Sequence, residues 1–100
     1  MPMKLYLAGP MSGYPEKNYP AFHAEAKRLR ALGYEVSSPA EVAEVSMGWL
    51  DAMRLDIVAL VGCDAIATLP GWQDSKGASI EVNLFLGLGL PVLVSSEITE

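Results

Sequence analysis

A glutamate near the start of the last long apolar segment has the clearest chemical potential in this sequence. Glu81 follows the polar stretch Ser75-Lys76-Gly77 and, at helical spacing, shares a face with the apolar residues Leu84, Phe85 and Leu88. A carboxylate turned toward a core is costly unless it is paired or protonated, and such groups are enriched at functional sites. The alternative is a glutamate at the rim of the core, whose stem packs while its head reaches water. We favour the functional site.

A second carboxylate lies in another apolar segment. Asp56 stands between Leu55 and Ile57, where we expect a helix. Two carboxylates on the apolar faces of different helices can act as nucleophile and general acid. Taken alone, Asp56 fits a solvated polar edge beside Arg54 slightly better. Tyr6, in the first apolar run, could orient a carboxylate with its hydroxyl, although an ordinary tyrosine at the core edge is more common.

Two loops contain residues that could bind a ligand. In the first, Gly9-Pro10-Met11-Ser12-Gly13, the spacing is neither that of a dinucleotide fingerprint nor that of a P-loop. Backbone N–H groups of Gly9, Ser12 and Gly13 could face a ligand. On this loop alone, a turn that uses glycine and proline for its geometry is the better interpretation.

The second loop leads into the segment that contains Glu81. Ser75 opens an expected helix, whose free N–H groups and dipole suit an anion, and Gly77 would let a phosphate approach closely. A plain serine N-cap explains Ser75 equally well. Trp72 could stack on a base or close a lid, or it could pack against a partner subunit.

The elements that position these residues alternate between strands and helices. We expect strands at 3–8, 34–37, 64–69 and 91–94, helices at 20–32, 46–61 and 76–88, and a tail at 95–100. This alternation predicts an α/β fold in three layers, with a short parallel sheet of four to five strands and helices on both faces, flavodoxin-like or Rossmann-like. Ligands bind outside the carboxyl ends of such strands, which places both loops at one edge.

Composition narrows the expected partners. The chain has 100 residues, which fits one domain over 1–100, and 51% of them are hydrophobic. This apolar excess predicts a homodimer, with the helices that carry Trp49 and Phe85 as the contact surface. The net charge of −5 disfavours a nucleic-acid polymer as partner, and no apolar run is long enough to predict a membrane span.

Cysteine and histidine usage completes this description. Cys63 is the single cysteine and the sequence does not begin with a signal peptide, so we expect a cytoplasmic protein. His23 has no further ligand at metal-binding spacing, and we expect no metal.

Three segments together resemble the nucleoside 2-deoxyribosyltransferase-like superfamily, and most of all a short branch of it found in bacteria and their phages. They are residues 5–13, Asp56 with Cys63-Asp64, and residues 75–81. The resemblance implies that Glu81 is a nucleophile that attacks the anomeric carbon of a 2-deoxyribonucleoside. It also implies that Tyr6 holds Glu81, that Asp56 helps protonate the leaving base, and that no cofactor takes part.

The same resemblance implies a class of substrate. Six positions before the nucleophile, transferases that act on free nucleosides carry an aspartate, whereas hydrolases of monophosphates carry a serine that binds the 5′-phosphate; here the residue is Ser75. Asp74 precedes it and would favour the transferase if it took that position.

We therefore expect an N-glycosidase of 2′-deoxynucleoside 5′-monophosphates, in which Ser12, Gly13 and Gly77 join Ser75 on the phosphate side. A deoxyribosyltransferase and a non-catalytic nucleotide-binding module are the alternatives. The resemblance also implies that a partner subunit completes each site.

Overall fold

The computed structural model describes residues 3–42 and 47–100. Its elements run in the order β1 (Lys4–Ala8), η1 (Pro15–Asn18), α1 (Tyr19–Ala31), β2 (Glu35–Ser37), α2 (Pro39–Val42), α3 (Trp49–Leu60), β3 (Ala65–Thr68), η2 (Trp72–Asp74), α4 (Lys76–Leu88), β4 (Val92–Val94) and η3 (Ser95–Glu97), where η marks a short 3-10 helix. The strands form one parallel sheet in the order β2-β1-β3-β4. The predicted α/β fold is confirmed, with four strands.

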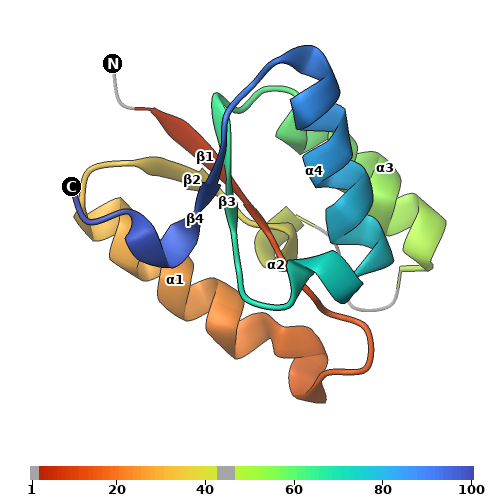
Figure 1. The fold of residues 1–100 in the computed structure, drawn as a ribbon. Helices are drawn as coiled ribbons and strands as arrows, with labels where there is room; N and C mark the ends of the chain where they lie inside the picture. Colours follow the sequence, from red (N-terminus) through yellow and green to blue (C-terminus); the bar gives the residue numbers. More distant parts are fainter. Residues whose placement is uncertain (1–2, 43–46) are drawn as a thin grey trace.

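Helices cover both faces of this sheet, α1 on one side and α3 and α4 on the other (Figure 1). The alternation of side chains along β1 decides which residues meet which layer. Leu5 and Leu7 pack with the α1 side, whereas Tyr6 and Ala8 pack with the side of α3 and α4. The sheet therefore separates two buried clusters, and Tyr6 belongs to the one beneath α3 and α4.

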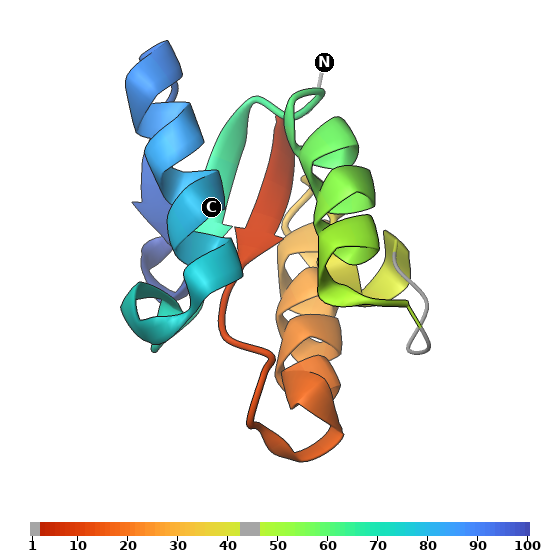
Figure 2. The same cartoon turned by 90° about the vertical axis from the view of Figure 1, so that its right-hand side faces the viewer.

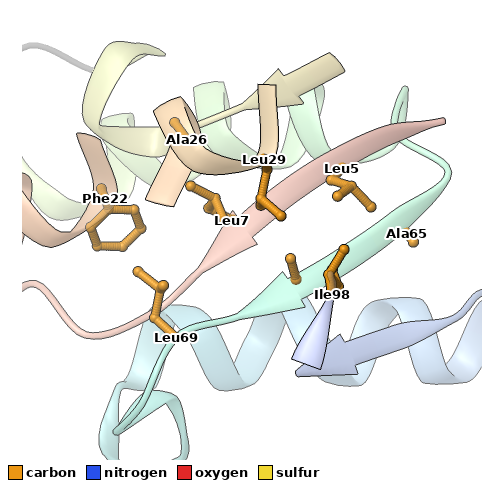
Figure 3. Packing of buried hydrophobic residues seen from close by; sticks show 9 residues of the cluster. Leu5, Leu7, Phe22, Ala26, Leu29, Ala65, Leu69 and Ile98 are labelled. Carbon is orange, nitrogen blue, oxygen red and sulfur yellow. The ribbon is translucent and has the colours of Figure 1, made fainter. Parts of the chain in front are cut away.

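The α1 cluster is entirely apolar. Phe22, Ala26 and Leu29 form the buried stripe of α1, as the sequence predicts, and they meet Leu5 and Leu7 from the sheet (Figure 3). The helix ends at Gly33, whose φ of +103° is the left-handed conformation that glycine adopts without strain. Apolar packing therefore holds α1 against this face of the sheet.

The C-terminal segment is not the tail that the sequence predicts. Ser95 is fully buried, and Ile98 packs into the α1 cluster. Arg28 of α1 donates hydrogen bonds to the carbonyl oxygens of Ser95 at 2.7 Å and Ile98 at 2.8 Å. These long-range bonds fix a segment whose polar sequence lacks any periodicity.

The predicted boundaries hold best for α4. Its range agrees with the expected helix, and Gly89, at φ 77°, ends it. The predicted start of the preceding helix, Ser46, lies outside the described residues; α3 begins at Trp49 with Gly48 as N-cap. Phe85 was expected on a surface between subunits, and that prediction is wrong, because its side chain is fully buried beneath α4.

The strand order determines where the site lies. The strands β1 and β3 are neighbours in the sheet. From β1 the chain continues through α1 on one face, and from β3 it continues through α4 on the other face. Such a switch between adjacent parallel strands leaves a crevice at their carboxyl ends, where ligands bind in doubly wound sheets. Both α3 and α4 begin near this edge (Figure 2), so their N-termini lie close to the loops that follow β1 and β3.

Candidate active site

A cavity of about 800 Å³ lies among the loop after β1, the start of α3 and the start of α4. Six of the predicted site residues line it: Gly9, Ser12, Asp56, Ser75, Gly77 and Glu81. They come from three separate stretches of the sequence, and only the fold brings them together. The cavity has the size of a small-molecule site.

Tyr6 and Glu81 form a buried pair at this cavity. The Tyr6 hydroxyl donates a 2.6 Å hydrogen bond to Oε2 of Glu81, and the two residues are 0% and 4% exposed. The pair forms because Tyr6 is on the strand face that α4 covers. Burial of the Tyr6 phenol, together with the neighbouring charges of Glu81 and Asp56, raises its pKa far above the usual range. Tyr6 is therefore a hydrogen-bond donor at every physiological pH.

Burial also controls the charge of Glu81. Loss of solvent raises the pKa of its carboxyl from 4.5 to about 8; the Tyr6 hydrogen bond opposes this rise, and the charge of Asp56 adds to it. Most Glu81 side chains are therefore protonated at neutral pH. A carboxyl whose pKa lies near neutrality can switch between proton donor and nucleophile.

Asp56 is the second buried carboxyl of the cavity. It is 7% exposed, and desolvation raises its pKa to about 6. Its Oδ1 is buried and has no hydrogen-bond partner within the described part of the chain. Buried carboxylate oxygens are normally paired, so an unpaired one that lines a cavity indicates a polar ligand or a proton to be transferred. On α3, Asp56 lies between the buried Met53 and Leu60.

Ser75 has the N-cap role considered from the sequence, and it also lines the cavity. It is the N-cap of α4, and its Oγ accepts a hydrogen bond from the backbone N–H of Ala78 at 3.3 Å. Its hydroxyl proton is still available to a ligand, because an oxygen that accepts one bond can donate another. Asp74, the last residue of η2, lines the same cavity.

Two glycines of the site also have a packing role. A Cβ on Gly77 would lie 3.0 Å from Sδ of Met53 and 3.7 Å from Nε1 of Trp49, so the glycine lets α3 approach the first turn of α4. A Cβ on Gly9 would lie 2.8 Å from Cβ of Leu69. Close packing between elements therefore explains these glycines, whether or not a phosphate also benefits from the space.

Two predicted residues lie apart from the main cavity. Gly13 is an exposed turn residue with φ +84°, and it does not line the cavity although the adjacent Ser12 does. Trp72 is half-buried against the cluster beneath α3 and α4, and it lines a second cavity of about 270 Å³ beside Thr68 and Val94.

Other residues at the cavity carried no clear signal in the sequence. Trp49, at the start of α3, and Lys76, at the start of α4, both line it, and Lys76 Nζ lies 4.6 Å from the centroid of the Trp49 ring. Lys17 reaches the cavity from η1, where Glu16, Lys17 and Asn18 all have positive φ. Three consecutive left-handed residues without a glycine cannot be anticipated from residue types.

Comparison with known proteins places this site in context. Residues 3–94 match the family described as Domain of unknown function (DUF4406). The chain belongs to this family. The match spans all three segments on which the resemblance to the nucleoside 2-deoxyribosyltransferase-like superfamily rests.

A solved structure shares the fold of this DUF4406 chain. It is a 2-desoxiribosyltransferase from Leishmania mexicana, which is 18% identical with a TM-score of 0.72. The match covers 93% of this chain and 63% of that one, so the present chain spans under two thirds of its length. No curated protein matches the sequence.

None of the helices in residues 3–42 and 47–100 is long and apolar enough to cross a membrane. No three side chains of histidine, cysteine, aspartate or glutamate gather there in a way that could hold a metal ion.

Proposed function

We propose that this protein is an N-glycosidase that cleaves 2′-deoxynucleoside 5′-monophosphates into a free base and 2-deoxyribose 5-phosphate. The observation that carries the proposal is the buried Tyr6–Glu81 pair beside Asp56, whose Oδ1 has no partner in the described chain. Two carboxyls with raised pKa values in one cavity can act as nucleophile and general acid in a double displacement at an anomeric carbon.

In the first step, the tautomer that carries the single proton of the pair on Asp56 reacts, and the ionised carboxylate of Glu81 attacks C1′ of the sugar. The C1′–N bond breaks, its electron pair leaves with the base, and Asp56 gives its proton to the base. Tyr6 holds Oε2 of Glu81, which leaves Oε1 as the attacking oxygen. The product of this step is a glycosyl ester on Glu81 and an ionised Asp56.

In the second step, water replaces the base. The Asp56 carboxylate takes one proton from the water, whose oxygen bonds to C1′ as the ester bond to Glu81 breaks. This releases 2-deoxyribose 5-phosphate and restores both carboxyls to their starting protonation. Two inversions at C1′ retain the configuration.

The start of α4 supports a phosphorylated substrate. Ser75 and Gly77 line the cavity at a helix N-terminus, where free N–H groups and the helix dipole favour an anion. Gly9 and Ser12 line the cavity from the loop after β1. We assign the 5′-phosphate to the space between these two segments.

Transfer to a second base is the alternative outcome of the same first step. The similar solved structure is described as a deoxyribosyltransferase, and Asp74 lies beside Ser75 at the cavity. A transferase would form the same ester on Glu81 and pass the sugar to an incoming base in place of water. A non-catalytic nucleotide-binding module would need the phosphate groups but not the Tyr6–Glu81 pair.

One experiment separates these functions. The protein is incubated with each of the four 2′-deoxynucleoside 5′-monophosphates, with and without a second free base, and the bases are resolved by chromatography. The proposal expects free base without an acceptor. New nucleotide formed only when the acceptor is present would indicate a transferase, and no change in any mixture would overturn both enzymatic functions.

We further propose that two copies associate and that the reaction takes place in the cytoplasm. Trp49 is 45% exposed and Leu50 is 55% exposed at the start of α3, next to the cavity. A partner packed there would cover this apolar surface. Light scattering at micromolar concentration tests the association, and a monomer would contradict it.

A further inference from the structure

Lys76 occupies an unusual electrostatic position at the cavity. It is the first residue of α4, it is exposed, and its ammonium lies over the Trp49 ring at 4.6 Å from the centroid. Both side chains line the cavity. A cation at a helix N-terminus opposes the helix dipole, so nothing in the helix itself favours a lysine here.

No carboxylate in residues 3–42 and 47–100 forms an ion pair with the Lys76 ammonium. The ion pairs found within the described residues are Arg28–Glu25, Arg30–Glu41 and Arg54–Asp51, and none includes Lys76. Asp74 precedes Lys76 by two residues and lines the same cavity, yet the ammonium lies on an aromatic ring. A cation–π contact at an exposed site is weak, so a ligand with a formal negative charge would displace it.

A second observation, an unpaired buried carboxylate oxygen, indicates that this cavity binds a polar ligand. Asp56, 7% exposed, leaves its buried Oδ1 without a partner in the described chain, and Asp56 lines the cavity together with Lys76. The ligand is therefore expected to offer a hydrogen-bond donor near Asp56 and a negative charge near Lys76. A nucleotide has both, with its base and its phosphate at opposite ends.

We propose that Lys76 is the residue that distinguishes phosphorylated from unphosphorylated ligands. In the empty site its ammonium rests on the Trp49 ring; when a 5′-phosphate binds at the start of α4, the ammonium leaves the ring and pairs with the phosphate. This inference rests on the proposed function for the identity of the ligand. The Trp49 ring thus contacts the Lys76 ammonium before the phosphate binds, and the fluorescence of Trp49 reports the loss of this contact.

The test uses binding and does not require turnover. 2-Deoxyribose 5-phosphate and 2-deoxyribose differ only in the phosphate, and both lack the base. Each is titrated into the protein with Trp72→Phe as background, so that the remaining tryptophan fluorescence comes from Trp49. We expect the phosphate to change the emission of Trp49 and the unphosphorylated sugar to leave it unchanged at the same concentrations.

Variants of Lys76 isolate the charge. Lys76→Met keeps the stem of the side chain, and we expect it to weaken binding of the phosphate about tenfold or more and to remove its effect on Trp49. Lys76→Arg keeps a cation that stacks on aromatic rings, and it should restore most of the affinity. Lys27→Met, an exposed lysine of α1 that does not line the cavity, is the matched control and should bind as the unmodified protein does.

Two results would overturn the inference. One is equal affinity of Lys76→Met and the unmodified protein for 2-deoxyribose 5-phosphate; the other is an equal response of Trp49 to both sugars. These results differ from a failure of the proposed function. If no base is released from any nucleotide but the phosphate binds in a Lys76-dependent way, the reaction is refuted and the role of Lys76 stands.

Discussion

Each face of the sheet has a glutamate on its covering helix, Glu25 on α1 and Glu81 on α4. The pKa of the first carboxyl is lowered and the pKa of the second is raised. On the α1 face, Glu25 is paired with Arg28 at 2.6 Å and accepts a hydrogen bond from Ser95, and these partners lower its pKa. On the other face, burial raises the pKa of Glu81 to about 8. The first carboxylate stabilises the fold as an ion, whereas the second is held where ionisation is costly.

This difference supports the proposed place of the reactive groups, on the side of α3 and α4. On the α1 side, the Glu25 carboxylate accepts hydrogen bonds from the Arg28 guanidinium and the Ser95 hydroxyl. The side chains clustered between α1 and the sheet are apolar. Within residues 3–42 and 47–100, the side of α3 and α4 buries two carboxyls, Asp56 and Glu81, and neither belongs to the ion pairs that Arg28, Arg30 and Arg54 form. A fold gains nothing from that arrangement, so a functional reason explains it best.

The largest expected effect separates the two glutamates by activity. Glu81→Gln removes the nucleophile but retains an oxygen for Tyr6, and it should reduce base release at least about 1,000-fold. Glu25→Gln is the matched control, since it makes the same chemical change on the opposite face, and it should keep the activity. Rates of base release from the preferred nucleotide measure both. Equal losses in the two variants would erase the contrast between the faces.

The pH profile of the reaction sharpens the comparison. Activity needs one proton on the Glu81–Asp56 pair: below about pH 6 both carboxyls are protonated and no nucleophile exists, and above about pH 8 both are ionised and no acid exists. We expect kcat/KM to be bell-shaped, with a maximum near the middle of that interval.

Tyr6→Phe tests whether the pKa of Glu81 sets the high-pH limb of the activity profile. Loss of the hydroxyl removes a bond that lowers the pKa of Glu81, so the upper limb should move to higher pH and the rate should fall roughly 10- to 100-fold. An upper limb that stays in place would mean that Tyr6 does not act on Glu81.

Stability should respond to pH in opposite directions on the two faces. The raised pKa of Glu81 means that the folded state holds a proton that the unfolded state loses above about pH 4.5, so stability falls as pH rises from there to about 8. Glu81→Gln removes this loss and should raise the free energy of unfolding by roughly 2 to 3 kcal/mol at pH 7, with little difference near pH 4.

Glu25→Gln should show the reverse dependence. The lowered pKa of Glu25 means that its contribution is present above about pH 4.5 and disappears as pH falls through the folded-state pKa. The variant should therefore be less stable than the unmodified protein at pH 7 and similar at low pH. Urea unfolding at several pH values measures both variants, and parallel curves for the two would contradict the comparison.

The sequence predicts regular, locally encoded features better than it predicts the site. The range of α4 follows from an apolar pattern between a serine N-cap and Gly89, and the buried stripe of α1 follows from helical spacing. Glu81 and Asp56 stood out because charged residues interrupt apolar faces. The fold class follows from the alternation of strands and helices.

Features that depend on contacts between distant residues could not be predicted in the same way. Tyr6 and Glu81 are 75 positions apart, and only the superfamily resemblance suggested their pairing. The cation–π contact between Lys76 and Trp49 joins the first residues of α4 and α3. The packing role of Gly77 in α4 depends on Met53 in α3. Residue types and local spacing contain no information on how closely two helices approach.

The smallest expected effect concerns the C-terminal segment, where the sequence predicts a tail. Arg28→Met keeps an apolar stem but removes the two donors to Ser95 and Ile98 and the partner of Glu25, so it should lower the free energy of unfolding by less than Glu81→Gln raises it at pH 7. The activity of the folded protein should not change, because these groups lie on the face away from the cavity. Urea unfolding and the rate of base release measure the two outcomes. If Arg28→Met lost activity while it remained folded, the α1 face would influence the site, and the division of labour between the two faces would fail.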